Sequence, residues 1–392
     1  MKRKNLALTS VILSSLLLGG CFEPTTKSTG MSVSEYEENI SSYFETSEEE
    51  KDSSVTTEIS FSQILSKPNT SAEAKEDISP ETTTSETPEE KEITISFLGD
   101  CTLASMKGEE SPGNMINYLN TKDTSYFFED CMDIIGNDDF TVANCENVFS
   151  DYATTEIGKD YSPAFWFRSS TKNAFVFADN SIDAVSLANN HTNDYGEKGL
   201  AETKSALEKA NVQWGDIDNT IYFEKDGVRI GVICAKFWSS YYVDSIVEKI
   251  KEVSESTDIQ IVFFHGGTEK VHTPEDWKVE GAHRFVDAGA DLVIGGHPHV
   301  LQPYEEYNGV SIIYSIGNFC YGGHRHPENR TVIYQQKFTL DSKNDIISSN
   351  ENIIPYYVYT GDTNNWRPSP IEDETEKNKV LDFLYGVSDS LF

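Results

Sequence analysis

Basic side chains are scarce in this 392-residue sequence. It contains 31 Lys and Arg against 65 Asp and Glu, which gives a formal net charge of −34 at pH 7. A field of that sign repels the phosphate backbone of DNA and RNA, so we expect no nucleic-acid partner. The charge is otherwise typical of a soluble secreted protein with an acidic segment.

Cysteine is also sparse. The chain has 6 cysteines and no C-x-x-C pair, which argues against a cysteine zinc site. Once Cys21 is set apart for the reason given below, an odd number remains, and this does not suit a complete disulfide framework. We expect the other five to be buried free thiols. They are Cys101, Cys131, Cys145, Cys234 and Cys320.

The apolar stretch at the N-terminus is too short to span a bilayer. Leu6–Leu18 follows three basic residues and, as a helix, would cover about 20 Å of a hydrocarbon core roughly 30 Å thick. We therefore predict a signal peptide over residues 1–21. Its end, Leu18-Gly19-Gly20-Cys21, resembles the lipobox of bacterial lipoproteins. That resemblance implies acylation of Cys21 and attachment to the extracellular face of the cell membrane; an ordinary cleaved signal is the alternative.

Large apolar side chains are few between Phe22 and Glu92. This segment is rich in Ser, Thr and Glu and carries 18 acidic and 5 basic residues. Such a composition cannot bury enough apolar surface to offset the entropy of ordering, and its like charges extend the chain. We predict that residues 22–92 form a disordered linker that lifts a folded domain off the membrane.

Order is predicted to begin at Ile93, where apolar and polar residues start to alternate. Strand-like segments then alternate with segments of helical periodicity, which predicts an α/β domain over residues 93–360. A hairpin is expected to turn at residues 225–227, residues 361–392 are expected to be peripheral, and we find no internal repeat. The expected strands are 93–98, 140–143, 184–187, 228–234, 259–264, 292–294 and 310–314, and the expected helices are 127–135, 197–210, 243–253 and 274–288.

Most of these strands end beside a potential metal ligand. In α/β sheets the carboxyl ends of the strands share an edge where sites form, so we expect these side chains to lie together. Taken singly, each has an ordinary explanation as a turn or solvated loop residue, but their recurrence at five strand ends is hard to explain as packing. They are Asp100; Asn144 and Glu146; Asn190, His191 and Asp194; His265 and Glu269; and His297 and His299.

The strongest single signal is Gly296-His297-Pro298-His299. Two imidazoles in a loop stiffened by proline can approach the same ions from one side. Mixed carboxylate, amide and imidazole ligands suit Mn, Fe or Zn better than Ca or Mg. Two ions about 3.5–4 Å apart can activate a bridging water and hold a phosphoryl group. We therefore predict a pair of divalent metal ions, with Asp100 as the natural bridge.

The order of these motifs resembles the capsule-synthesis CapA family. The matching residues run from Gly99-Asp100 through Asn144-x-Glu146, Ala188-Asn189-Asn190-His191, His265-Gly266-Gly267 and Gly296-His297-Pro298-His299 to Tyr314–Phe319. Members of that family take part in making or exporting poly-gamma-glutamate capsules. Their domain is similar to the calcineurin-like metallophosphoesterase fold, a two-sheet α/β sandwich with a dinuclear site. The resemblance covers about Ile93 to Tyr321, and more loosely continues to Tyr359.

The resemblance implies a role for each matching residue, with one departure. Active phosphoesterases begin with Asp-x-His, whereas Asp100 is followed by Cys101 and Thr102. The implied metal ligands are Asp100, Glu146, Asn190, His265, His297 and His299. His191 would be the general acid or base, oriented by Asp194. Glu269, Asn144 and Arg168 are candidate substrate contacts, with Glu269 alternatively a further ligand and Arg168 able to meet a carboxylate or phosphate in bidentate fashion.

Three functions remain open at this point. The leading hypothesis is a membrane-anchored surface protein of poly-gamma-glutamate capsule synthesis or export with a phosphoesterase-like metal site. Its partners would be the capsule polymer and the membrane proteins of the capsule synthase. The alternatives are a surface metal-dependent phosphomonoesterase or nucleotidase, and a non-catalytic assembly or polymer-binding factor. Whether the protein is an enzyme is undecided; if it is, we expect a metal-dependent hydrolase of phosphoesterase type.

Overall fold

The computed structural model describes residues 90–106, 113–159, 164–321 and 329–391. The predicted signal peptide, Cys21 and nearly all of the acidic segment lie outside these residues. Across the described ranges, no helix combines the length and apolarity that crossing a membrane requires. All five remaining cysteines are buried and free within the described chain, which confirms the prediction.

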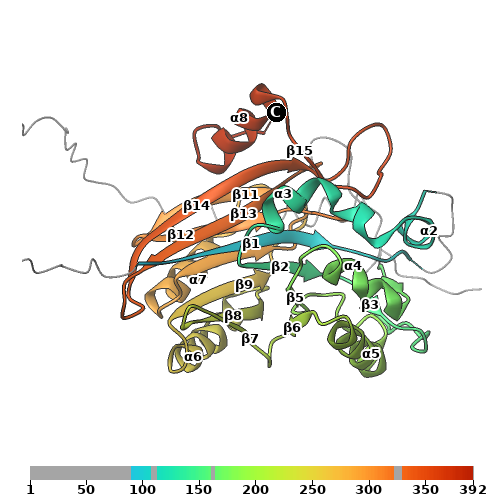
Figure 1. The fold of residues 1–392 in the computed structure, drawn as a ribbon, viewed down its shortest axis with the longest axis horizontal. Helices are drawn as coiled ribbons and strands as arrows, with labels where there is room; N and C mark the ends of the chain where they lie inside the picture. Colours follow the sequence, from blue (N-terminus) through green and yellow to red (C-terminus); the bar gives the residue numbers. More distant parts are fainter. Residues whose placement is uncertain (1–89, 107–112, 160–163, 322–328, 392) are drawn as a thin grey trace, which may run out of the picture. The chain divides into compact units, whose positions relative to one another are not determined.

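Two β-sheets form the centre of the fold (Figure 1). The larger has the strand order β15-β14-β13-β1-β2-β5-β6, and the smaller has the order β11-β12-β10-β9-β8-β7. The larger contains β1 (Lys91–Cys101), β2 (Phe140–Cys145), β5 (Ala184–Ser186), β6 (Gln213–Gly215), β13 (Arg330–Leu340), β14 (Ile346–Tyr357) and β15 (Ser369–Pro370). The smaller contains β7 (Ile221–Lys225), β8 (Val228–Lys236), β9 (Ile259–His265), β10 (Leu292–Gly296), β11 (Leu301–Tyr307) and β12 (Val310–Ile316). Two short strands, β3 (Val148–Phe149) and β4 (Arg168–Ser169), pair separately.

Alternation along the strands buries both faces of each sheet. In β9, Ile261 and Phe263 belong to the core between the two sheets, whereas Val262 and Phe264 pack on the opposite side in the core under α6 (Val243–Ser254) and α7 (Asp276–Asp287). Because both faces of such a strand are buried, its sequence is a continuous apolar run. The layers are therefore helix, sheet, sheet and helix, and the expected two-sheet α/β sandwich is confirmed.

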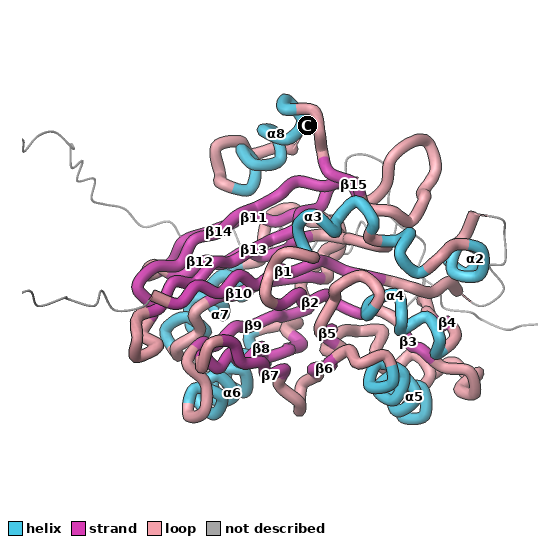
Figure 2. Tube along the Cα trace, viewed as in Figure 1, coloured by secondary structure: helices cyan, strands magenta, loops and turns pink. Residues whose placement is uncertain are grey.

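Helices cover the outer faces of the sheets (Figure 2). α5 (Gly196–Lys209) buries Ala206 and Leu207 against the outer face of the larger sheet, in a core that also contains residues of β1, β2 and β5. Shorter helices on that side are α2 (Met115–Thr121), α3 (Met132–Ile135) and α4 (Phe175–Ala178).

The helix expected over 127–135 is broken, and that prediction was wrong. The segment forms 3₁₀ turns at Thr124–Phe127 and Glu129–Cys131 before α3. Phe128 leaves the helical region, with φ −128° and ψ 16°, and both Phe127 and Phe128 are buried. Burying two successive aromatic rings takes precedence over the regular helical path.

The hairpin between β7 and β8 turns at Asp226 and Gly227, as expected. Their φ angles are 52° and 73°, the pair of positive values that a two-residue type I′ turn requires. Asp-Gly is favoured there because aspartate and glycine tolerate the left-handed region.

The C-terminal segment packs more closely than we expected. Its strand β15 pairs with β14, and α8 (Glu374–Leu384) places Val380, Phe383 and Leu384 in the core that lies between the sheets. The long antiparallel strands β13 and β14 were also absent from the expected set. Residues 330–384 thus complete the larger sheet and close one end of the sandwich.

Candidate metal centre

The carboxyl ends of parallel strands bring the predicted ligands to one edge of the sandwich. In the larger sheet, Asp100 of β1 is the register partner of Asn144 in β2. In the smaller sheet, His265 of β9 is the partner of Gly296 in β10. Both Asp100 and His265 are completely or almost completely buried. Because the two sheets face each other, ligands from both sheets meet between them.

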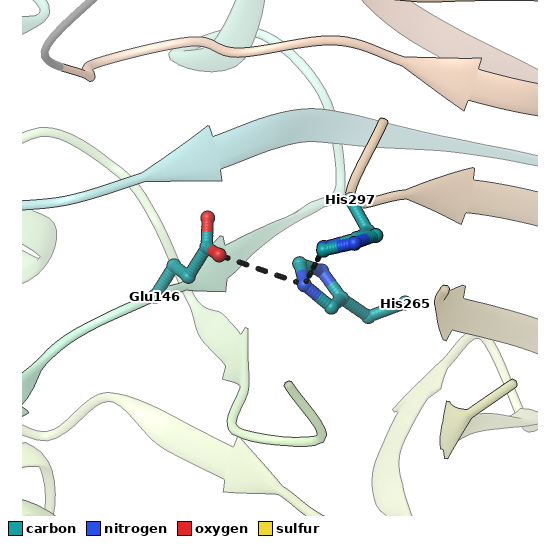
Figure 3. Close-up of side chains that lie close together, drawn as sticks. All are labelled: Glu146, His265 and His297. Carbon is teal, nitrogen blue, oxygen red and sulfur yellow. Dashed lines mark hydrogen bonds and ion pairs between the residues drawn. The ribbon is translucent and has the colours of Figure 1, made fainter. Parts of the chain in front are cut away.

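Three groups of acidic and histidine side chains converge closely enough to hold a metal ion. In each group the potential ligand atoms all lie within 4.8 Å of one another. Glu146 belongs to two of the groups, so neighbouring ions could share its carboxylate. Figure 3 shows Glu146, His265 and His297 pointing toward one another. The groups are Glu146, His265 and His297; Asp100, Glu146 and His299; and Glu269, His297 and His299.

Glu146 shows most clearly that the centre suits a cation. The side chain is fully buried, and neither carboxylate oxygen receives a hydrogen bond from any described residue. Its Oε1 lies 3.6 Å from Nε2 of His265 and 3.8 Å from Nε2 of His191. Burial and the nearby Asp100 carboxylate raise the pKa of Glu146 well above its usual range. A buried carboxylate without donors is costly unless a bound cation compensates it, and the surrounding donors suit a divalent transition metal.

Asp100 is held as a carboxylate at the middle of the cluster. One oxygen lies 3.2 Å from Nδ1 of His299 and the other 3.5 Å from Nδ1 of His265. Asn144 donates to Oδ1 at 2.7 Å, and the backbone N–H of His297 donates to Oδ2 at 3.3 Å. Burial alone would raise the pKa of Asp100, but His265 and His299 outweigh it and hold the pKa well below its usual range.

The three histidines of the cluster differ in charge. Burial lowers the pKa of His265, and burial together with the other two imidazoles lowers that of His297 strongly. Both are therefore in the neutral form that binds metals. Burial also acts to lower the pKa of His299, but Glu146 and Asp100 outweigh it and raise the pKa to about 9. A metal ion bound by His299 would compete with that proton.

The loop that carries His297 and His299 adopts an unusual backbone. Their φ angles are 96° and 58°, in a region that residues other than glycine seldom occupy. Such conformations persist where the surrounding structure enforces them, often at functional sites. Here they let the His297 amide reach Asp100 while both imidazoles face the cluster. Nδ1 of His299 is in turn held by Oδ1 of Asn318 at 2.8 Å.

His191 lies beside the cluster rather than within one of its groups. Its Nδ1 is 2.8 Å from Oδ2 of Asp194, which leaves Nε2 on the side of Glu146. Asp194 also accepts a hydrogen bond from the backbone of Phe167 at 2.8 Å and pairs with Lys159 at 2.6 Å. A carboxylate held this firmly fixes the ring of His191, and this arrangement suits an acid or base that transfers a proton at Nε2.

The other predicted residues occupy different surroundings. Oδ1 of Asn190 lies 2.9 Å from Nε2 of His265. Asn144 contacts Asp100 and His265, so it braces ligands instead of facing solvent. Glu269 is exposed and close to His297 and His299. The guanidinium of Arg168 donates to the backbone oxygen of Ser150 at 2.7 Å and lies over the ring of Tyr195, and no described contact joins it to the cluster.

Trp238 and Tyr321, two further neighbours of the cluster, escaped the sequence reasoning, whereas Asn189 belongs to a motif noted above. Asn189 donates to Oδ1 of Asn144 at 3.0 Å. The ring of Trp238 lies 4.6 Å from that of His297, edge to face. Phe167 lies 4.6 Å from His191, and Tyr321 lies 4.9 Å from His299. Trp238 could have been noticed because it follows β8 at the same sheet edge as the predicted ligands.

Comparison with known proteins supplies the family. The model described as "Bacterial capsule synthesis protein PGA_cap" matches residues 94–322. The Capsule biosynthesis protein CapA of Bacillus anthracis is 25% identical, covering 74% of this chain and 72% of its own length. The PGA biosynthesis protein CapA of Bacillus subtilis (strain 168) is 26% identical, with coverages of 76% and 80%. A probable polyglutamine synthesis accessory protein of Mycobacterium tuberculosis is 29% identical over 41% of this chain and 52% of its own.

The matched segment spans more than half of the chain and includes every residue of the three converging groups. The two-sheet sandwich and its clustered ligands also agree with what the motifs implied. This chain therefore belongs to the bacterial capsule synthesis protein family PGA_cap.

Proposed function

We propose that this protein is a surface accessory protein of capsule synthesis that acts on an anionic, polyglutamate-related substrate at a hydrolase-type metal centre. The names of its Bacillus relatives support the capsule role. The observation that carries the metal centre is Glu146, whose buried carboxylate lacks hydrogen-bond donors among the described residues and lies among imidazoles and a second carboxylate.

The residues present suit two divalent ions of the Mn, Fe or Zn type. Such a pair would supply Lewis acidity toward a carbonyl or phosphoryl oxygen and a strong nucleophile at neutral pH. Six residues would hold the ions: Asp100, Glu146, Asn190, His265, His297 and His299. The two oxygens of Asp100 already approach different histidines.

His191 favours a hydrolytic centre over a purely structural one. A structural metal site needs ligands only, whereas His191 is oriented by Asp194 with its Nε2 toward the cluster. In the proposed reaction His191 would give a proton to the leaving group, and Asp194 would stabilise the ring in its charged form. The same arrangement also supports the second candidate function, a surface phosphomonoesterase.

The place of action follows from the N-terminal motif. Acyl chains on Cys21 would hold the protein on the extracellular face of the cell membrane, where a growing capsule polymer and its synthase proteins are within reach. Replacing Cys21 with Ala should release the protein from the membrane fraction or block its processing. An unchanged distribution, with an unchanged mass of the mature N-terminus, would exclude the anchor.

A single preparation of the full chain tests the proposal. We expect elemental analysis to find bound transition metal, and the Mn²⁺-loaded protein to bind and cleave gamma-linked glutamate oligomers. Asp100→Asn is the control for metal-dependent activity. Turnover of an aryl phosphate, with the oligomer neither cleaved nor bound, would favour the phosphomonoesterase. Binding of the oligomer without cleavage would favour a non-catalytic assembly factor.

A further inference from the structure

The chain that follows β8 is clamped against the ligand-bearing end of β9. The backbone N–H of Phe237 donates to the carbonyl of His265 at 3.0 Å. Gly266 makes this approach possible, because a Cβ at that position would lie only 1.6 Å from the carbonyl oxygen of Phe237. Residues 236–238 therefore have a fixed position beside the centre.

Lys236 and Trp238 lie on the same side of this segment as the metal ligands. Lys236 is the register partner of His265, and paired residues of parallel strands share a face. Phe237 points the opposite way, into the core under α6 and α7. Trp238 returns to the side of the centre, with its ring 5.7 Å from that of His265 and 4.6 Å from that of His297. Lys236 and Trp238 are both only partly buried.

The ammonium group of Lys236 has no partner in the described part of the protein. It makes no hydrogen bond or ion pair there, although burial lowers its pKa and the charge of Asp216 partly offsets this. Asp216 is already engaged by Lys204 at 2.6 Å and by the backbone N–H groups of Asp218 and Asn219 at 3.0 and 2.9 Å. This ammonium is not fully shielded from water, so it is open to an anionic ligand that enters beside the centre.

We propose that Lys236 and Trp238 form an anion subsite beside the metal centre. The ammonium of Lys236 binds a carboxylate or phosphate of the substrate, and the ring of Trp238 packs against the apolar part next to it. This inference rests on the proposed function. It also answers an electrostatic difficulty, because a protein with a net charge of −34 repels a polyanion. Positive charge must then be concentrated where the substrate binds.

Calorimetric titration of the full, Mn²⁺-loaded chain tests the subsite. The ligands are a gamma-linked glutamate oligomer and, separately, inorganic phosphate. Lys236→Met removes the charge and keeps an unbranched side chain, whereas Lys236→Arg retains the charge. Lys209→Met is the matched control, because Lys209 is exposed on α5 and its replacement changes the net charge by the same amount. We expect Lys236→Met to weaken binding about 10- to 100-fold, the usual effect of losing a charged hydrogen bond, and Lys209→Met to leave it unchanged.

The two ligands identify the anion, and the controls separate the hypotheses. If Lys236→Met weakens binding of the oligomer alone, the subsite binds carboxylate. If it weakens binding of phosphate alone, the subsite binds phosphate. If it weakens binding of both ligands, the subsite accepts either anion. Wild-type affinity of Lys236→Met for both ligands overturns the subsite while the proposed function stands. Failure of the wild-type protein to bind either ligand overturns both.

Thermal stability gives a second, ligand-free test. If Lys236 is kept for binding, Lys236→Met should melt at the same or a higher temperature, because it replaces an unpartnered ammonium with an apolar group. A clear fall in melting temperature, with metal content unchanged, would make Lys236 a structural residue and contradict the subsite.

Discussion

Nε2 of His265 lies 3.1 Å from Nδ1 of His297, although the two residues come from different strand ends of the smaller sheet. Burial lowers the pKa of both rings, so both imidazoles are neutral and their contact is not an ion pair. Two neutral imidazoles that converge in this way, with Glu146 3.6 Å from His265, are arranged to share a cation.

Removing a ligand should therefore remove metal and stability together. We expect His297→Ala and Asp100→Asn each to lower bound metal and to lower the melting temperature measured with metal present, because metal binding stabilises only the folded chain. Elemental analysis and calorimetry measure both effects. Asp218→Asn, the same substitution as Asp100→Asn at an exposed position, is the control. Full metal content and an unshifted transition in His297→Ala would mean that the Gly-His-Pro-His loop is not a metal-binding loop.

Replacing His191 should have a different effect. His191 belongs to none of the three converging groups, so we expect His191→Ala to keep wild-type metal content. Hydrolysis of whichever substrate the wild-type protein cleaves should fall by roughly 10²–10⁴-fold, the usual contribution of a general acid or base. Loss of metal with an intact fold would instead identify His191 as a ligand.

Gly266 should tolerate no side chain. In Gly266→Ala the new Cβ would overlap the backbone of Phe237, and backbone cannot move aside as a flexible side chain can. We expect destabilisation of about 1–3 kcal/mol or more, measured by urea denaturation. Gly158→Ala is the control, because a Cβ there meets no atom within 4 Å. Equal stability of the two variants would mean that β8 is not clamped to β9 as described.

Asp291 should make stability depend on pH below neutrality. Burial raises the pKa of Asp291 to about 6, above the value near 3.9 of an unfolded aspartate. Between these values the folded state holds the proton more tightly, so this part of the stability is present at low pH and is lost as pH rises from about 4 to 6. Asp291→Asn should remove that part of the slope, since an amide oxygen can still accept from the backbone of Gln260. Denaturation of both proteins at several pH values measures the difference.

The control for this titration is Asp218→Asn, at an exposed position. Its stability should follow the wild-type curve through the same pH range. An Asp291→Asn curve that runs parallel to the wild type would contradict the shifted pKa.

The convergence of the candidate ligand side chains at one edge could be predicted because it depends on local patterns. The strands that precede Asp100, His265 and Gly296 are apolar runs with clear ends, and parallel register then brings those ends to one edge. The two-sheet sandwich came from the family resemblance, and its alternating faces follow the period of two that strands impose.

What was missed depends on contacts between distant parts of the chain. Trp238 reaches His297 only because Gly266 lets the backbone of Phe237 approach. The strands β13 and β14 mix polar and apolar residues and are stabilised by pairing with β1 and with each other. The position of α8 is set by three apolar side chains that fill one end of the core, and no local pattern identifies that destination.

The pairing of β1 with β13 also fixes when this domain can fold. The first strand of the larger sheet lies between β2 and a strand near the end of the chain, so its second edge stays open until residues 330–340 have been made. The core between the sheets is complete only when α8 (Glu374–Leu384) has also packed into it. Contacts between such distant segments form slowly because a long loop must close first. The core between the two sheets therefore closes only after segments from opposite parts of the domain have met, so the order of folding follows from the order of the strands in the larger sheet.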